Sequence, residues 1–262
     1  MFKFCSLYSG SSGNSLLVQT PNTKILIDAG ESAKKIETAL NQIEIDIHDI
    51  DAILVTHEHS DHIKGLGTLV KKFDIPVYAN QETWEAMPEI AGKVQLEKQN
   101  QFQVNEKFDI GELKVLPFQI PHDAANPCGF NLYYKNQKIS IATDLGHIDS
   151  KLIHYLEESS FILLEANYDP NILKCSRYPY ILKQRIAGPN GHLSNEMAGK
   201  TISYLTNSGL SNVMLGHLSR ENNFPELAYK TVIDELCSQN FDENKLKLNV
   251  ASRTAPSPII EI

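Results

Sequence analysis

The segment that most constrains the fold is Thr56–His62, which reads THEHSDH and directly follows the apolar run Ala52–Val55. The apolar run predicts a buried strand, and the motif after it places three imidazoles and the Asp61 carboxylate within six residues. Buried imidazoles and carboxylates are costly unless they are paired or bound to metal. The sequence therefore predicts a metal site at the end of a strand.

The spacing inside the motif indicates more than one ion. If the chain stays extended through His57 and His59, both rings point to the same side, while Asp61 and His62 in the turn beyond reach a neighbouring position. Ligands this close predict two adjacent metal ions. The alternative is that Ser60 and Asp61 cap a helix that begins here. That interpretation can hold alongside the first, but by itself it gives the histidines no role.

Length and composition predict one cytoplasmic domain over residues 1–262. No linker rich in Pro, Gly or Ser divides the chain, and its composition does not change along it. The first residues lack the apolar core of a signal peptide, and no apolar run approaches the length of a membrane span. The four cysteines have no CxxC spacing, as expected of reduced thiols in a cytosolic protein, and none is a strong ligand candidate.

The formal net charge of −8 argues against a broad basic surface for nucleic acid. Two bound divalent ions would offset only half of this charge. Any polyanionic substrate must therefore be bound locally.

Strand and helix patterns alternate along most of the chain. The predicted strands are Phe2–Tyr8, Ser15–Gln19, Lys24–Asp28, Ala52–Thr56, Pro76–Ala79, Val94–Leu96, Phe102–Val104, Glu112–Ile120, Gly129–Tyr134, Lys138–Thr143, Phe161–Glu165, Asn212–Leu215 and Lys245–Val250. The predicted helices are Ser32–Ile43, one directly after the metal motif, Glu82–Ile90, Ser150–Glu158, Asn195–Asn207 and Pro225–Ser238. Strands with interspersed helices in both halves fit the α/β class (α+β in some schemes), as a four-layer αβ/βα sandwich.

Three further polar residues each follow an apolar strand, where sheets usually present their sites. They are His122, Asp144 and His217. Each has an ordinary alternative, as a loop histidine, a helix cap and a satisfied core residue respectively. Together they supply the ligands that a two-metal site still needs.

These residues resemble the metallo-β-lactamase superfamily, whose pattern is an early Asp, then HxHxDH, then a His, an Asp and a final His. The match covers nearly the whole chain. The resemblance implies that one ion is bound by His57, His59 and His122, the other by Asp61, His62 and His217, and that Asp144 bridges both with a water or hydroxide. Asp28 would orient the site without binding metal, and a plain turn before Gly30 is its alternative.

The superfamily includes lactamases, thioesterases, lactonases, oxidoreductases and nucleases, so the fold does not determine the reaction. Flavin-linked di-iron members carry an acid where this chain has His59, which favours hydrolysis here. Asp144 and His217 are only 73 positions apart, too few for the β-CASP insertion of other nucleases. No thiolate biases the ligand set, so zinc, manganese and iron all suit it.

Two elements within those residues resemble the tRNA 3′-processing nucleases. Glu165 ends a predicted strand, and His192 lies in a His-x-Ser element before a helix. In those nucleases the acid holds the histidine and the histidine assists departure of the leaving oxygen, so the resemblance implies a catalytic pair. A general acid contributes roughly a hundredfold to ten-thousandfold. The alternative is that Ser194 or Asn195 caps the helix and His192 is a loop residue.

Residues 171–191 form a local basic stretch without any acidic residue. The stretch contains Lys174, Arg177, Lys183 and Arg185, interleaved with Tyr178 and Tyr180. Basic groups with aromatic neighbours suit a phosphate backbone with stacked bases. A plain solvated loop is the alternative.

Several short motifs together resemble the bacterial YycJ (WalJ) branch of the superfamily, metal-dependent exonucleases that act from DNA 5′ ends. The motifs are Ser9–Ser15, Thr56–His62, Pro121–Asp123, Gly191–Asn195 and His217–Asn223. The resemblance implies a phosphodiesterase with two divalent ions, acting as a 5′ to 3′ exodeoxyribonuclease on DNA and not on membranes.

In that interpretation Asp61, Glu165 and His192 are catalytic. Ser11 lies in a loop whose amides suit a phosphate, and Asn222 and Asn223 contact substrate. The alternatives are a thioesterase or cyclic phosphodiesterase, an RNA-processing nuclease on the same site, or a non-enzymatic metal-stabilised binding module.

Overall fold

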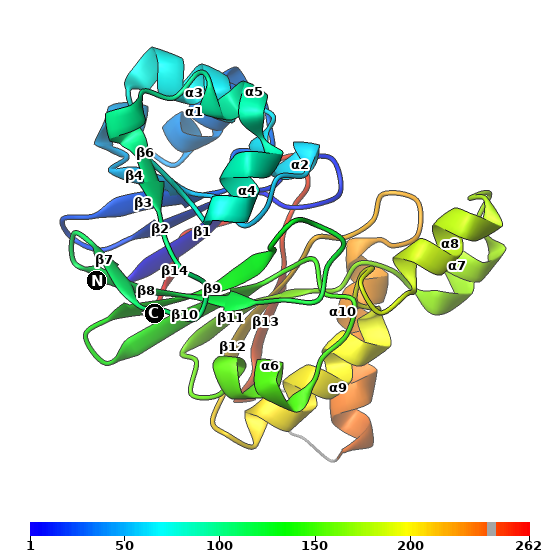
Figure 1. Cartoon of the computed structure of the whole chain (residues 1–262). Coiled ribbons are helices and arrows are strands. Elements are labelled where there is room, and N and C mark those ends of the chain that lie inside the picture. Colours follow the sequence, from blue (N-terminus) through cyan, green and yellow to red (C-terminus); the bar gives the residue numbers. More distant parts are fainter. Residues whose placement is uncertain (240–244) are drawn as a thin grey trace. The chain divides into compact units, whose positions relative to one another are not determined.

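The structure is a computed structural model that describes residues 1–239 and 245–262 (Figure 1). The chain divides into two compact units. The first contains Met1–Gln119, Ala124–Asn136 and Ser252–Ile262, and the second contains Ile120–Asp123 and Gln137–Ala251. The single domain predicted over residues 1–262 stays a prediction.

The first unit is built on a mixed sheet with strand order β14-β1-β2-β3-β4-β5-β6. These strands are β1 (Lys3–Tyr8), β2 (Ser15–Gln19), β3 (Lys24–Ile27), β4 (Ala52–Leu54), β5 (Val77–Ala79), β6 (Gln99–Gln101) and β14 (Ile260–Glu261). β3 and β4 run parallel, with Ile27 opposite Leu54. Because parallel strands end at the same edge, Asp28 and the metal motif emerge side by side.

Apolar helix faces cover this sheet. α1 (Ala33–Gln42) begins at Ser32, whose side chain accepts a hydrogen bond from the backbone N of Lys35, and buries Ala33, Ile36, Ala39 and Leu40. α3 (Leu66–Phe73), which lies beside α1 (Figure 1), buries Leu66, Leu69 and Val70 in the same core cluster. The unit also contains α2 (Ser60–Ile63) and three antiparallel strands, β7 (Phe108–Ile110), β8 (Leu113–Gln119) and β9 (Cys128–Tyr134).

The second unit is built on four parallel strands in the order β10-β11-β12-β13. They are β10 (Gln137–Ala142), β11 (Phe161–Glu165), β12 (Asn212–Gly216) and β13 (Lys247–Val250). Glu165 lies opposite Gly216 in register, so the residues after β10, β11 and β12 meet at one edge. The helices are α6 (Ser150–Leu156), α7 (Pro170–Cys175), α8 (Tyr180–Ile186), α9 (Asn195–Thr206) and α10 (Pro225–Ser238).

Several predicted elements are wrong. No strand forms at Val94–Leu96 or Phe102–Val104. Val94 is buried by packing in the core cluster, and the neighbouring strand is the polar β6. The helix predicted over Glu82–Ile90 is split by Pro88 into α4 (Gln81–Ala86) and α5 (Pro88–Ala91).

The basic stretch forms the two short helices α7 and α8 instead of a plain solvated loop. Asp169 caps α7 by accepting from the backbone N of Asn171 and Ile172, with Pro170 at the first helical position.

Candidate metal centre

In the first unit, Asp28 is buried and fixes the start of the metal motif. Its Oδ1 accepts from the backbone N of Thr56 at 2.9 Å, and its Oδ2 accepts from Thr56 Oγ1 at 2.9 Å. Asp28 Oδ2 also lies 2.7 Å from Nδ1 of His62, which is fully buried. The carboxylate therefore sets the ring orientation and tautomer of His62.

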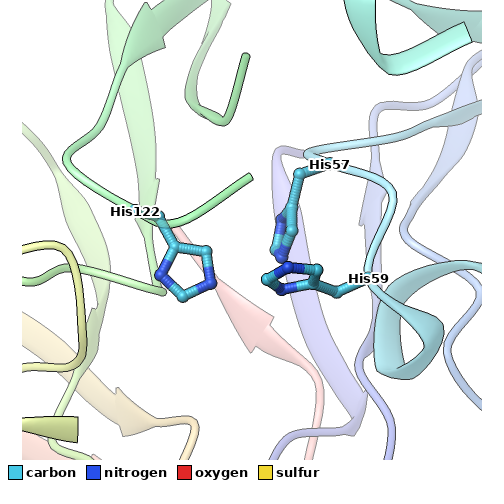
Figure 2. A group of neighbouring side chains, drawn as sticks. All are labelled: His57, His59 and His122. Atoms are coloured by element: carbon cyan, nitrogen blue, oxygen red, sulfur yellow. The ribbon is translucent and has the colours of Figure 1, made fainter. Parts of the chain in front are cut away.

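His57 and His59 follow β4 on one extended segment. Their ring centroids are 4.6 Å apart, and Figure 2 shows the two rings close together beyond the strand. Nδ1 of His57 lies 3.0 Å from Thr56 Oγ1. His59 is the extended residue at the N-cap of α2, and its side chain makes no capping hydrogen bond. Ser60 is the first residue of the helix, so neither Ser60 nor Asp61 is the predicted cap. The extended arrangement and the helix start coexist.

Asn14, in the Gly- and Ser-rich loop of residues 9–14, is a neighbour of the metal motif that the sequence did not indicate. Its Nδ2 lies 3.2 Å from Nε2 of His62 and 3.4 Å from Oδ2 of Asp61. Gly30 pairs with the same loop, and a Cβ added there would lie 1.6 Å from the carbonyl oxygen of Asp61. Only glycine fits this approach. Ser11, by contrast, is an exposed turn residue.

In the second unit, Glu165 is fully buried and accepts four hydrogen bonds. Its Oε1 lies 2.9 Å from Nδ1 of His192 and 2.7 Å from Nδ1 of His217. Its Oε2 accepts from the backbone N of Leu145 at 2.6 Å and of Leu193 at 3.1 Å. The structure thus brings the predicted Glu165–His192 pair together. It adds His217 as a second partner of the same carboxylate, which the sequence motifs did not predict.

His122 and Asp144 lie beside this pair. Nδ1 of His122 lies 3.2 Å from the carbonyl oxygen of Gly191, and the rings of His122 and His192 are 5.3 Å apart. Oδ1 of Asp144 lies 3.6 Å from Nε2 of His122 and 3.5 Å from Nδ1 of His217. Figure 2 labels His122 on the loop after β8. Ligand atoms of Asp144, Glu165, His192 and His217 all lie within 4.8 Å of one another.

One feature is common to five of these imidazoles, His57, His62, His122, His192 and His217. In each, Nδ1 faces an oxygen partner from the ring's own unit. Such a partner holds the proton on Nδ1 and leaves the lone pair on Nε2, the arrangement typical of metal-binding histidines. The donor set of imidazoles and carboxylates therefore fits divalent ions.

The surroundings shift several pKa values. Burial by itself would raise the pKa of Glu165, but His192 and His217 outweigh burial and hold that pKa well below its usual range. Burial lowers the pKa of His122, against the attraction of Asp144. Burial also opposes the charge on His192, but the Glu165 carboxylate overcomes it and raises the pKa of His192.

Three site residues adopt a left-handed backbone. The φ angles are 61° at Asp28, 60° at Asp144 and 55° at His217, each just beyond a strand end. Positive φ is uncommon for residues other than glycine and gathers at functional sites, where surrounding contacts hold it. The local turns therefore aim these side chains along the edge of each sheet.

The predicted substrate-binding residues have different environments. Nε of Arg185 donates to Oδ2 of Asp123 at 2.6 Å, whereas Lys174 and Arg177 are exposed. Asn223 is 5% exposed, donates to the carbonyl oxygen of Ala166, and its amide pairs reciprocally with that of Asn195. Asn222 is also buried, and its Nδ2 lies 3.3 Å from Ser219 Oγ. In this structure Asn223 braces the loops that follow β11 and β12.

The two mixed sheets flanked by helices, with His and Asp clusters at the strand ends, are those of a metallo-hydrolase and match the predicted αβ/βα fold. Residues 8–183 match the model of the metallo-beta-lactamase superfamily, and the chain belongs to that superfamily. Its fold is similar to that of YhfI from Bacillus subtilis, with a TM-score of 0.72 and 14% identity over 98% of this chain and 99% of that one.

Two curated relatives match most of the chain. Exodeoxyribonuclease YycJ of Bacillus anthracis is 39% identical over 91% of this chain and 90% of its own length. Exodeoxyribonuclease WalJ of Streptococcus pneumoniae (strain D39) is 37% identical over 100% of this chain and 98% of its own. These matches confirm the branch of the superfamily that the sequence motifs indicated. No helix in the described part of the chain is both long and apolar enough to cross a membrane.

Proposed function

We propose that this chain is a metal-dependent phosphodiesterase, an exodeoxyribonuclease that degrades DNA from the 5′ end in the cytoplasm. The named activity of relatives that match nearly its whole length supports the proposal. The observation that carries it furthest is the pair of His192 and Glu165 beside Asp144. A metal site alone serves many hydrolases, whereas a histidine held by a buried carboxylate adds a proton donor for an alkoxide leaving group.

The proposed ligands are those that the superfamily pattern implies. By that pattern, His57, His59 and His122 would hold one ion, Asp61, His62 and His217 would hold the second, and Asp144 would be a ligand of both. Two divalent ions bound by these residues would activate water and neutralise charge on the phosphoryl oxygens. Zinc, manganese and iron all suit the oxygen and nitrogen donors.

The protein's own side chains orient the proposed ligands and supply the proton for the departing oxygen. Glu165 accepts from Nδ1 of both His192 and His217, so one carboxylate orients a proposed ligand and the proposed general acid. Because His192 is held with its proton on Nδ1, its Nε2 is the atom that delivers a proton to the departing oxygen when the ring is charged. Asp28 orients His62 directly, and it orients His57 through Thr56.

The test combines metal content with digestion of end-labelled strands. His59→Ala and Asp61→Ala are expected to lose bound metal and hydrolysis together, with secondary structure preserved by circular dichroism. His48→Ala is the matched control, since its imidazole is exposed and outside the cluster. The substrates are single- and double-stranded DNA and RNA with 5′-phosphate or 5′-hydroxyl ends, supplied with zinc or manganese.

Normal turnover by a metal-depleted His59→Ala protein would exclude the proposed metal mechanism. Hydrolysis of thioesters or cyclic nucleotides without digestion of any strand would favour the small-molecule alternative. Preferred digestion of RNA would favour the RNA-processing alternative.

A further inference from the structure

A cavity of about 520 Å³ lies at helices α7 and α8, outside the cluster of proposed ligands. Its lining includes the side chains of Tyr168, Tyr178 and Tyr180, together with Leu173 and Lys174. We refer to it as the tyrosine cavity. A volume of this size is typical of sites for small organic groups, which are lined mainly by aromatic and apolar side chains with a few polar ones.

The walls of the tyrosine cavity are held by bonds within the helix pair. Nε2 of Gln184 donates to the hydroxyl of Tyr180 at 2.9 Å, one turn along α8. Nζ of Lys183 donates to the carbonyl oxygens of Lys174 and Ser176, each at 2.7 Å, so α8 is tied to the end of α7 (Figure 1). Tyr180 is nevertheless 72% exposed. An aromatic ring fixed in place but left open to solvent suits stacking on a planar ligand.

The segments around the tyrosine cavity are hydrogen-bonded to the loop that carries His192. The backbone N of His192 donates to the carbonyl oxygen of Ile186, the last residue of α8, at 2.8 Å. Tyr168 pairs with Ser194 as an isolated bridge, and its carbonyl oxygen accepts from the backbone N of Asn195 at 3.0 Å. The lining residue Tyr168, and Ile186 next to the lining residue Ala187, are therefore linked to the loop that carries the proposed general acid.

We propose that the tyrosine cavity is a nucleobase subsite, in which a base of the substrate strand stacks on Tyr178 and Tyr180 while Lys174 faces the adjoining phosphate. This inference rests on the proposed nuclease function and adds which part of the strand the protein holds. Residues 171–191 carry only basic charges, which complement a phosphate backbone in a chain of net charge −8. Stacking on aromatic side chains tolerates every base, as a degradative exonuclease requires.

The experiment scans a 5′-phosphorylated single strand with one abasic (tetrahydrofuran) residue at each successive position and measures kcat/KM. In the wild type, one position is expected to lose roughly 5- to 150-fold, the effect of removing one stacked base. Tyr178→Ala and Tyr180→Ala are expected to lose a similar factor on the intact strand. Neither alanine variant should show a further loss of kcat/KM on the strand that lacks that base. Each variant is compared with itself on two strands, so a general change in turnover cancels.

Matched variants make the readout specific. Tyr178→Phe and Tyr180→Phe keep the rings and should keep the abasic penalty. Tyr204→Ala removes an exposed tyrosine of α9 outside the cavity and should also keep it. Because Tyr180 is so exposed, its variants still report if Tyr178→Ala does not fold.

Two failures are distinguishable. A wild type that digests the intact strand but shows no penalty at any position, or alanine variants that retain the full penalty, would overturn the nucleobase subsite and leave the proposed function standing. A wild type that hydrolyses bis(p-nitrophenyl) phosphate but no nucleic acid would overturn the proposed function itself.

Discussion

The carboxylate of Glu165 accepts from two imidazoles and two backbone amides without contact to solvent. Fixed donors of this kind preserve the charge of a buried carboxylate, which otherwise favours the neutral form. A charged Glu165 in turn stabilises the protonated form of His192. At the scale of single residues, this contact suits the His192 ring to the acid role proposed for it.

Replacement of His192 tests that role. His192→Ala is expected to lower kcat on DNA by roughly a hundredfold to ten-thousandfold, because the departing alkoxide loses its proton donor. Bound metal, measured by elemental analysis, should be unchanged. The loss should be much smaller on bis(p-nitrophenyl) phosphate, whose leaving group needs no proton.

His154→Ala provides the control, since its side chain is exposed on α6 in the same unit. Equal losses on both substrates would mean that His192 acts before the leaving oxygen departs. An unchanged rate on DNA would remove His192 from the mechanism.

At the scale of elements, two turns of the first unit meet at a glycine. Gly111 joins β7 to β8 with a φ of 52°, and a Cβ there would lie 2.2 Å from Thr23 Oγ1. Gly111→Ala is expected to destabilise the fold by about 1–3 kcal/mol, because strain and the close contact add. The fall in Tm would be roughly 2–4 °C per kcal/mol, measured by calorimetry.

Gly209→Ala separates the two causes of that loss. Gly209 also has a positive φ, of 91°, but no atom of the described residues lies within 4 Å of the added Cβ. Its variant should show the backbone cost alone. If both variants lose the same stability, the contact with Thr23 has no energetic weight.

Glu112, beside this glycine, links the same turns and gives a dependence on pH. Its Oε2 accepts from Thr20 Oγ1 and from the backbone N of Asn22, and its Oε1 accepts from Asn22 Nδ2. The hydrogen bond from Thr20 is the largest cause that lowers the pKa of Glu112, followed by that from Asn22. A lowered pKa means that the ionised carboxylate stabilises the fold above its usual pKa, and that this contribution is lost as the pH falls.

Glu112→Gln is therefore expected to lower Tm at pH 7, since an amide nitrogen cannot accept from Asn22 or Thr20. The difference between wild type and variant should shrink as the pH falls through the acidic range. Thermal unfolding from pH 3 to 7 measures it. A difference that stays constant with pH would show that the charge of Glu112 contributes nothing.

The elements predicted best from the sequence are those whose pattern lies within their own residues. Strands such as β4 and β12 were predicted because each is an apolar run, and the histidines just beyond them indicated a site at the strand end. β6 is polar and has no apolar pattern in its sequence. Only its pairing with β5 in the folded structure identifies it as a strand. Asp169 followed by Pro170 is a helix-start signal within the sequence, and it could have predicted α7.

The candidate site was likewise predicted only in part. The residues that follow the superfamily pattern were identified individually. Their partners Thr56 and Asn14 were not, because hydrogen bonding between segments depends on the folded backbone. The attachment of His217 to Glu165 joins residues 52 positions apart, and no sequence motif encodes it.

At the scale of the whole molecule, the proposed ligands extend from His57 to His217 in the chain. Ions that bind only the folded chain stabilise it by mass action, by about 3–4 kcal/mol when their concentration exceeds Kd by 100- to 1,000-fold. Chelation with EDTA is therefore expected to lower Tm by roughly 5–15 °C. Zinc or manganese should restore it, as followed by calorimetry.

His59→Ala is the reference for this measurement, because EDTA should leave its Tm nearly unchanged. Equal Tm values for the wild type with and without EDTA, in samples shown to be metal-loaded beforehand, would indicate that the ions contribute nothing to folding.

The shared acceptor Glu165 also bears on how such an enzyme can evolve. A substitution at this position disturbs a proposed ligand and a proposed acid at once, so no single change there can adjust one without harming the other. Substitutions that alter substrate preference are then expected at positions that contact neither His192 nor His217. Tyr178 and Tyr180 are such positions, and homologues with different substrate preferences are expected to diverge there first.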